Sequence, residues 1–205
     1  MFVAVAHVCT CRQDAHHKDL WLYVNFKVRP EHGPARARAR ELMNELDFAT
    51  VDEASRPYPE YLRELGRHRF SLAPAGNGLD THRAWESLYL GVLPLVEDSP
   101  VSRAFAGMRI VGSENGEGSE GGAGEGGEAM KGRSEGEVQL MDGGLLPMVV
   151  VDDWRLISLH VLDAAWGLAL ERRWHWEVLA LGSWRAAMQC CSRCPACLEN
   201  DAMPS

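Results

Sequence analysis

The stretch RFSLAPAGNGLDTHRAWESLYLGVLPLV, residues 69–96, decides the predicted fold. Arg69–Ala73 alternates in polarity as a strand does, and Pro74 ends that strand because proline cannot donate to a sheet ladder. A helix is expected over about His82–Leu90, and an apolar strand begins again near Leu93. The order strand, loop, helix, strand favours a parallel sheet that is covered by helices.

The loop Ala75–Asp80 joins the first of these strands to the helix. Gly76 and Gly78 have no Cβ, so we expect positive φ angles here and a close approach of a ligand to the backbone; Asn77 also tolerates such angles. Asp80 or Thr81 is expected to cap the helix with its side chain. Gly91 is expected to end the helix as its left-handed residue.

The start of this helix has the chemistry of an anion site. Unpaired N–H groups and the helix dipole attract negative charge, and Arg83 adds a planar cation that suits a diphosphate. Glu86 follows His82 by four residues and Arg83 by three, so the three can share one helix edge, where the carboxylate could accept two ribose hydroxyls. The alternative is an ion pair between Glu86 and Arg83, with glycines that only form a turn. Spacing alone favours this alternative.

The run PAGNGLDTHRAWESLYLGVLPLVEDSP, followed later by LLPMVVVDDW, resembles the donor-domain signature of the exostosin-like glycosyltransferases and related xylosyltransferase-type proteins. The shared features are a Pro-x-Gly-x-Gly loop, a His-Arg-x-x-Glu helix and Gly-x-x-Pro before an apolar strand. The resemblance covers about Lys18–Ala187 with one interruption, and it is dense over Phe70–Pro100 and Leu146–Trp154. It implies the C-terminal, donor-binding Rossmann-like half of a GT-B glycosyltransferase, located in the Golgi or another secretory membrane.

The resemblance implies that the chain binds a nucleotide sugar, with a UDP-sugar as the expected class, for transfer to a glycan or glycoprotein acceptor. It implies no tightly bound cofactor, although a divalent cation assists some members. The expected catalytic residues are Asp153 and His82. A non-catalytic nucleotide- or sugar-binding remnant stays open, because it would share every donor-site residue. The expected donor-binding residues are Gly76, Asn77, Gly78, Asp80, His82, Arg83, Glu86 and Ser99.

Strands and helices also alternate outside the central stretch. The expected strands are Leu20–Phe26, Phe48–Val51, Met108–Val111 and Leu145–Val151, and the expected helices are Pro34–Leu46 and Tyr58–Gly66. About five strands precede the closing helices, which suffices for one doubly wound sheet with ligands beyond the carboxyl ends of its strands. A GT-B enzyme needs a second such half, so we expect an incomplete catalytic unit.

Several polar residues have two interpretations. Glu97, Asp98 and Ser99 follow a strand and either contact substrate or form a polar loop. Asp152 and Asp153 are adjacent, so at most one faces the site and the other is expected to cap a helix. The basic run from Arg36 to Arg40 is interpreted as the exposed face of its helix.

The formal charge of −8 arises largely from residues 112–137, which contain seven Glu and half of the twenty Gly. This tract is interpreted as a disordered acidic insertion within a donor domain over residues 18–188, with flexible termini at 1–17 and 189–205. The remaining charge does not suggest a nucleic-acid surface. No apolar run has the ~20 residues of a membrane span, so an anchor would have to lie upstream.

Cysteines and tryptophans near the two ends of the chain form the last group of motifs. Cys190, Cys191, Cys194 and Cys197 have spacing that suits a metal, a redox pair or disulfides, and a metal or redox module is the weaker alternative function. Cys9 and Cys11 lie among histidines that are expected to be solvated. The segment Leu156–Met188 is expected to form one or two helices. Its tryptophans Trp174, Trp176 and Trp184 are interpreted as packing residues, with sugar stacking as the alternative.

Overall fold

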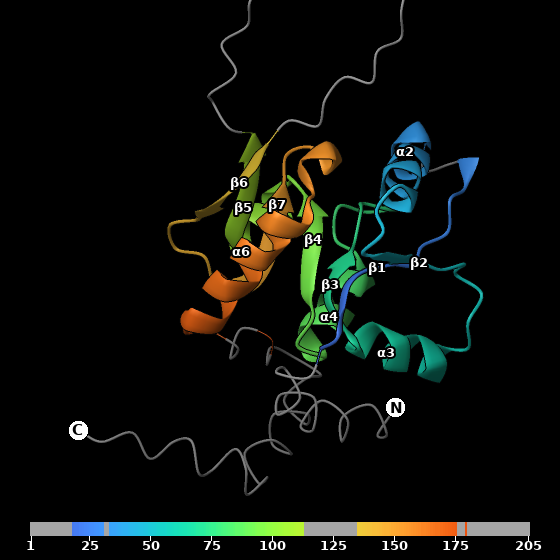
Figure 1. Ribbon diagram of the computed structural model, residues 1–205, viewed down its shortest axis with the longest axis horizontal. Coiled ribbons are helices and arrows are strands. Elements are labelled where there is room, and N and C mark those ends of the chain that lie inside the picture. The colour runs from blue at the N-terminus through green and yellow to red at the C-terminus, as the bar shows by residue number, and fades with distance from the viewer. Residues whose placement is uncertain (1–17, 31–32, 113–134, 176–178, 180–205) are drawn as a thin grey trace, which may run out of the picture.

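The computed structural model describes residues 18–30, 33–112, 135–175 and 179, which form one seven-stranded sheet flanked by helices (Figure 1). The strands are β1 (Leu20–Val24), β2 (Ala49–Val51), β3 (His68–Leu72), β4 (Leu93–Glu97), β5 (Ala106–Gly112), β6 (Gly136–Leu140) and β7 (Leu146–Val151). The helices are α2 (Gly33–Asn44), α3 (Tyr58–Gly66), α4 (His82–Tyr89), α5 (Pro100–Phe105), the 3-10 helix η3 (Trp154–Leu156) and α6 (Leu159–Glu171).

The strand order is β2-β1-β3-β4-β7-β5-β6. The strands from β2 to β5 in this order are all parallel, and β6 pairs antiparallel with β5 at the edge. The predicted α/β class with a Rossmann-like parallel sheet is therefore confirmed. The expected number of about five strands is wrong, because the structure has seven in its described residues alone.

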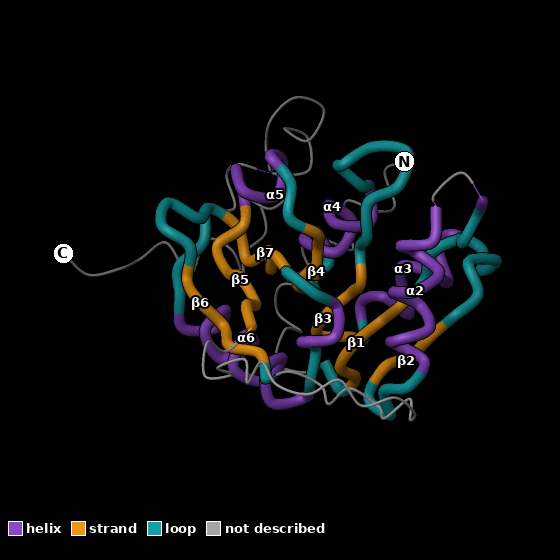
Figure 2. Tube along the Cα trace, turned by 90° about the horizontal axis from the view of Figure 1, so that it is seen from above, coloured by secondary structure: helices purple, strands orange, loops and turns teal. Residues whose placement is uncertain are grey.

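The helices cover both faces of the sheet, and the strands alternate their side chains between the two layers. Phe70 and Leu72 of β3 pack in one core with residues of α2 and α6, whereas Ala73 packs with α4. Ser71 lies between Phe70 and Leu72 in the strand, and its hydroxyl oxygen lies 2.6 Å from that of Ser87 on α4. Figure 2 shows α4 and α5 on one side of the strands and α6 on the other.

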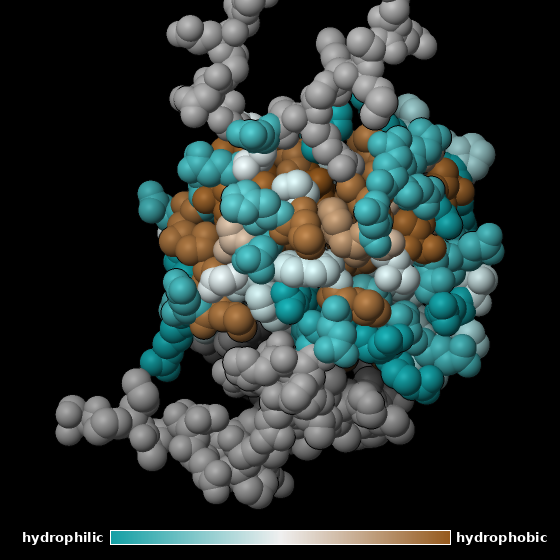
Figure 3. All heavy atoms as spheres, viewed as in Figure 1, coloured by the Kyte–Doolittle hydropathy of each residue, from teal (hydrophilic) through white to brown (hydrophobic). Residues whose placement is uncertain are grey.

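The face seen in Figure 1 belongs to the layer of α2 and α6. Figure 3 shows there that apolar residues reach the surface in small patches among polar ones. Most of the apolar mass lies beneath, in a core that includes Met43 of α2, Trp166 of α6 and the central strands. Trp174 is also buried in this core, as its interpretation as a packing residue predicts.

The chain changes direction across the sheet beside β1. It leaves β1 through α2 to reach β2 on one side, and it leaves β3 through α4 to reach β4 on the other. Because α2 and α4 cover opposite faces, the loops after β1 and β3 separate at the carboxyl edge. Such a topological switch point is where ligands bind in open parallel sheets.

Several element boundaries agree with the sequence. Helix α3 spans Tyr58–Gly66 as predicted, and α4 ends one residue before its predicted end. Gly91 has a φ of 63° and ends α4 in the left-handed conformation, as expected. Ser99 and Pro100 open α5, with the Ser99 hydroxyl accepting a hydrogen bond from the Ser102 N–H.

The glycine- and glutamate-rich tract begins and ends inside a β-hairpin. Strand β5 extends to Gly112, and β6 starts at Gly136, so these two glycines and Glu137 lie in paired strands. The predicted insertion over residues 112–137 is thus corrected at both ends. Residues 113–134 lie outside the described part of the chain.

Replacing residues 113–134 with a short Gly-Ser turn is expected to change the unfolding free energy by no more than about 1 kcal/mol. Gly112 and Gly136 are already register partners in the hairpin, so a short turn can close it without moving either strand. Chemical denaturation of the two chains measures the difference. A loss of several kcal/mol would show that the tract supports the fold.

His68 is a buried titratable side chain in the fold. Its Nδ1 lies 2.9 Å from the Glu64 carbonyl, which requires a proton on Nδ1, and its ring stacks on Tyr23. Among the described residues its Nε2 has no hydrogen-bond partner, so a second proton would be buried without an acceptor. Burial lowers the pKa of His68 from its ordinary value of 6.5.

The stability of the chain is therefore expected to fall as the pH drops below about 6.5. The unfolded chain takes up the proton first, because the pKa of His68 is lower in the folded state. His68→Phe preserves the stacked ring and removes the titration, so its stability is expected to vary less between pH 6.5 and 5. Parallel denaturation series at these two pH values measure this, and identical pH slopes would contradict it.

Candidate functional site

A pocket of about 430 Å³ opens at the carboxyl edge of the sheet, at the switch point between β1 and β3. Its walls come from the segments that follow β1, β2 and β3 and from the first turns of α3 and α4. The predicted donor-binding residues that line it are Gly76, Asn77, Gly78, Asp80, His82, Arg83 and Glu86. The structure thus brings together seven of the eight predicted residues.

The charge of the pocket wall is predominantly positive. Five lysines and arginines face two acidic residues, and His82 is also part of the wall. The basic residues are Lys27, Arg29, Arg36, Arg56 and Arg83, and the acidic ones are Asp80 and Glu86. Arg56 is paired with Asp52, and the remaining excess of positive charge favours a small anionic ligand.

The glycine loop after β3 differs from the prediction in its backbone angles. Neither Gly76 nor Gly78 has a positive φ, so the expectation of left-handed glycines here is wrong. Gly76 instead leaves room for a side chain, since a Cβ on it would lie 2.6 Å from Nη2 of Arg36 and the guanidinium would have to move. The loop is closed by a hydrogen bond from the Gly76 N–H to the Gly78 carbonyl, 3.0 Å long.

Arg36 of α2 lies beneath this loop and is only 5% exposed. Its Nε donates to the Ala75 carbonyl at 2.7 Å, its Nη2 to the Pro74 carbonyl at 3.2 Å and its Nη1 to the Lys27 carbonyl at 3.2 Å. The interpretation of this residue as part of an exposed basic face is therefore wrong. Carbonyl groups that are distant in sequence hold its guanidinium inside the fold.

Arg83 lies half-buried in the pocket wall. Its Nε donates to the Asn25 carbonyl at 2.6 Å, which joins the start of α4 to the end of β1. No carboxylate within the described part of the chain forms an ion pair with it. Burial lowers the pKa of Arg83, while Tyr61 and Glu86 act in the opposite direction. An anion in the pocket would supply the missing countercharge.

Glu86 is held by two tyrosines of α3 and not by Arg83. The Tyr58 hydroxyl donates to Oε1 at 3.1 Å, and the Tyr61 hydroxyl donates to Oε2 at 3.0 Å. Burial, followed by the neighbouring Glu86, raises the pKa of Tyr58 to about 12 and that of Tyr61 further, so both phenols donate at neutral pH. A carboxylate has about four lone-pair positions, so Glu86 retains acceptor capacity for ligand hydroxyls.

The first turn of α4 offers backbone donors to the pocket. Thr81 is the N-cap residue, but its side chain makes no capping hydrogen bond, and its buried hydroxyl has no partner among the described residues. Asp80 instead accepts a 2.5 Å hydrogen bond from the Trp85 indole. The predicted side-chain cap is therefore absent. The turn combines N–H groups and the positive end of the helix dipole beside Arg83.

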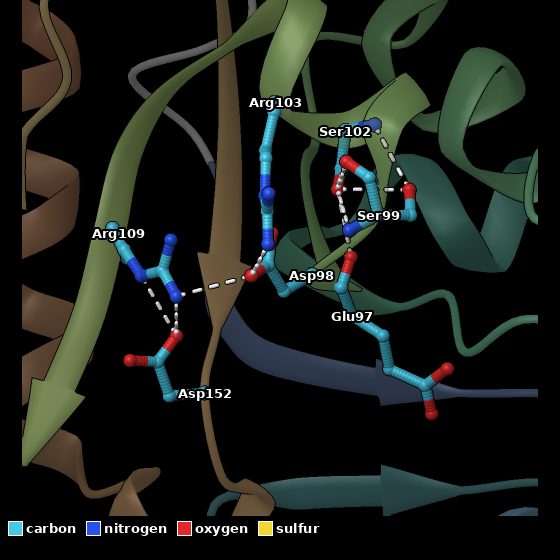
Figure 4. Close-up of polar contacts among 7 residues, drawn as sticks. All are labelled: Glu97, Asp98, Ser99, Ser102, Arg103, Arg109 and Asp152. Carbon is cyan, nitrogen blue, oxygen red and sulfur yellow. Dashed lines mark hydrogen bonds and ion pairs between the residues drawn. The ribbon is translucent and has the colours of Figure 1, made fainter.

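Two predicted residues lie outside the pocket wall. Ser99 caps α5, and Asp153 caps η3 while pairing with Arg155. The neighbouring Asp152 and Asp98 flank Arg109, at 2.7 and 3.2 Å, at the ends of β7 and β4 (Figure 4). This second polar cluster is therefore neutralised by its own ion pairs.

The part of the pocket that follows β1 and β2 is not among the predicted site residues. Asn25, Lys27 and Arg29 come directly after β1, and Ala54 and Arg56 follow β2. The rule that ligands bind beyond the carboxyl ends of parallel strands could have identified them, since the strand over Leu20–Phe26 was predicted. Tyr58 and Tyr61 carry no such signal, because they are also ordinary packing residues of an amphipathic helix.

No protein-family model matches the chain, and no curated protein matches it significantly. Across the described ranges, no helix is both long and apolar enough to cross a membrane. In the same ranges, no group of three His, Cys, Asp or Glu side chains could hold a metal ion. The two cysteine clusters, Trp176 and Trp184 lie outside those ranges.

Proposed function

We propose that the chain is a glycosyltransferase donor domain of the exostosin-like GT-B type, and that its pocket binds a nucleotide sugar, with a UDP-sugar as the expected class. One observation carries the proposal: Arg83, half-buried and without a carboxylate partner among the described residues, lies beside the uncapped start of α4. A guanidinium and helical N–H groups together bind phosphate oxygens. A diphosphate there would provide the countercharge that this part of the pocket lacks.

The remaining residues fit the other parts of such a ligand. Glu86 follows Arg83 by three residues on α4, so ribose hydroxyls could bind Glu86 while the diphosphate binds at the start of the helix. Tyr58 and Tyr61 fix the carboxylate in advance, which reduces the entropy lost on binding. During transfer, Arg83 and the helix dipole would stabilise the charge that develops on the leaving diphosphate. A divalent cation held by the diphosphate could assist.

A second candidate function, nucleotide or sugar binding without transfer, is favoured by the position of Asp153. This expected catalytic carboxylate pairs with Arg155 and does not line the pocket, which leaves His82 as the catalytic candidate in the wall. The described residues form a single sheet, whereas a GT-B enzyme closes a second domain over its donor. A glycan acceptor and a secretory location are expected only under the first candidate, the donor domain of a glycosyltransferase.

Turnover measurements test whether the chain by itself transfers a sugar. The purified chain is incubated with a panel of nucleotide sugars and oligosaccharide acceptors, and glycosidic product is measured together with nucleotide binding. We expect binding without transfer by the purified 205-residue chain, because its described residues form one sheet, whereas excluding water and aligning the acceptor takes a second domain in a GT-B enzyme. Product formed at an enzymatic rate and lost on Glu86→Ala would show that the chain is catalytically complete. Absence of nucleotide binding would overturn the donor domain, and absence of both nucleotide and sugar binding would overturn both candidates.

A further inference from the structure

Arg36 connects the two walls of the pocket across the switch point. Its guanidinium donates to the Lys27 carbonyl beyond β1 and to the Pro74 and Ala75 carbonyls beyond β3. These carbonyls belong to two segments that diverge from each other at the carboxyl edge. One buried side chain therefore sets the spacing between them.

Gly76 provides the space in which this guanidinium lies. A Cβ on Gly76 would lie 2.6 Å from Nη2 of Arg36, a distance that requires the guanidinium to move. The same substitution at Gly78 would meet no atom closer than 3.8 Å. A side chain at Gly76 would therefore displace Arg36, whereas one at Gly78 would not.

Arg36 and Arg83 bring two positive charges to the same pocket wall. Burial lowers the pKa of Arg36, and repulsion from Arg83 lowers it further, whereas Glu97 raises it. Arg36 is fixed by its three carbonyl partners, and Arg83 by the Asn25 carbonyl. Two immobilised guanidiniums in one pocket suit a ligand that carries two linked anionic groups.

We propose that Arg36 and Arg83 form a two-cation clamp for a diphosphate, and that Gly76 is required because it leaves room for the Arg36 guanidinium. The inference rests on the proposed function, since it concerns the same pocket. It extends that function by assigning a role to Arg36 and by setting the ligand class. The clamp selects nucleoside diphosphates and their esters over nucleoside monophosphates and neutral nucleosides.

The test compares four probes, uridine, UMP, UDP and inorganic pyrophosphate, by calorimetry on the full chain and three variants. Arg36→Lys retains the charge but loses the planar fork, and Gly76→Ala displaces the guanidinium without changing the charge. Both substitutions are expected to weaken the binding of UDP and of pyrophosphate by about tenfold or more. The binding of UMP is expected to weaken less, and that of uridine by less than about twofold. Gly167→Ala, in α6 and outside the pocket wall, is the matched control; a Cβ there meets no atom within 4 Å, so this variant is expected to bind all four probes as the parent does.

The outcomes separate the clamp from the donor function. An equal loss for uridine and UDP in both variants would show that Arg36 only supports the pocket, and the clamp would be rejected while nucleotide binding stood. Unchanged UDP binding by Gly76→Ala would reject the role of Gly76. Pyrophosphate binding that depends on Arg36, without any gain from uridine, would support the clamp and reject the donor function. Failure of the parent to bind UDP and pyrophosphate would reject both.

Discussion

Arg83→Ala is expected to weaken the binding of UDP by about 1.5–3 kcal/mol, or roughly 10- to 150-fold. The substitution removes the half-buried guanidinium that lies beside the start of α4 and has no carboxylate partner within the described residues. Arg83→Lys keeps a charge without the fork, so its affinity is expected to be intermediate. Isothermal titration calorimetry measures the three affinities.

Arg103→Ala is the matched control for this experiment. Arg103 is an exposed arginine that pairs with Asp98 outside the pocket wall, so its removal is expected to leave UDP binding unchanged. Thermal melting of each variant shows whether the chain remains folded. Equal affinities of the parent and Arg83→Ala would remove the main support for the proposed function.

Glu86→Ala is expected to act on both binding and stability. The variant loses the proposed ribose acceptor, so UDP affinity is expected to fall about tenfold or more. It also leaves the Tyr61 hydroxyl in a largely buried position without its acceptor, at a cost of about 1–3 kcal/mol of unfolding free energy. Calorimetry and chemical denaturation measure the two effects.

Tyr58→Phe separates the two effects of Glu86. It removes one hydrogen bond to Glu86 but retains the ring and the carboxylate, so its stability is expected to change by less than about 1 kcal/mol. Its UDP affinity is expected to stay close to that of the parent. If Glu86→Ala also binds UDP like the parent, Glu86 does not contact the ribose and serves only to pair the tyrosines.

The central stretch was predictable because its signals are local. Alternating polarity defines β3, the helical spacing defines α4, and Gly91 ends that helix through its own backbone preference. His82, Arg83 and Glu86 share one helix edge for the same reason. The residues that line the pocket from this stretch were predicted through the family resemblance, since spacing alone favoured an ion pair between Glu86 and Arg83 and a simple glycine turn.

Arg36 was not predictable because its partners are distant in sequence. The Pro74 and Ala75 carbonyls that hold it lie 38 and 39 residues away, and nothing in the run from Arg36 to Arg40 distinguishes it from its exposed neighbours. The expected positive φ at Gly76 is wrong, and the group that lies close to this glycine in the structure is the Arg36 guanidinium. Contacts between segments far apart in the sequence therefore determine both the burial of Arg36 and the limited space at Gly76.

Strand β6 and Ser99 show two further limits of local patterns. Strand β6 lies at the sheet edge with mostly exposed side chains, and its short Glu-Val-Gln-Leu alternation follows directly on a glycine-rich tract that hides it. Ser99 follows a strand at the carboxyl edge, as a ligand-binding residue would. Its hydroxyl instead caps α5 through Ser102, and a cap and a ligand contact have the same sequence signal.

The most direct test of the central claim is a crystal structure of the chain grown with saturating UDP. We expect density for the diphosphate at the start of α4, with oxygens within hydrogen-bond distance of Arg83, and for the ribose beside Glu86. Density for UDP elsewhere on the surface, or an empty pocket at a concentration where calorimetry shows saturation, would contradict the account.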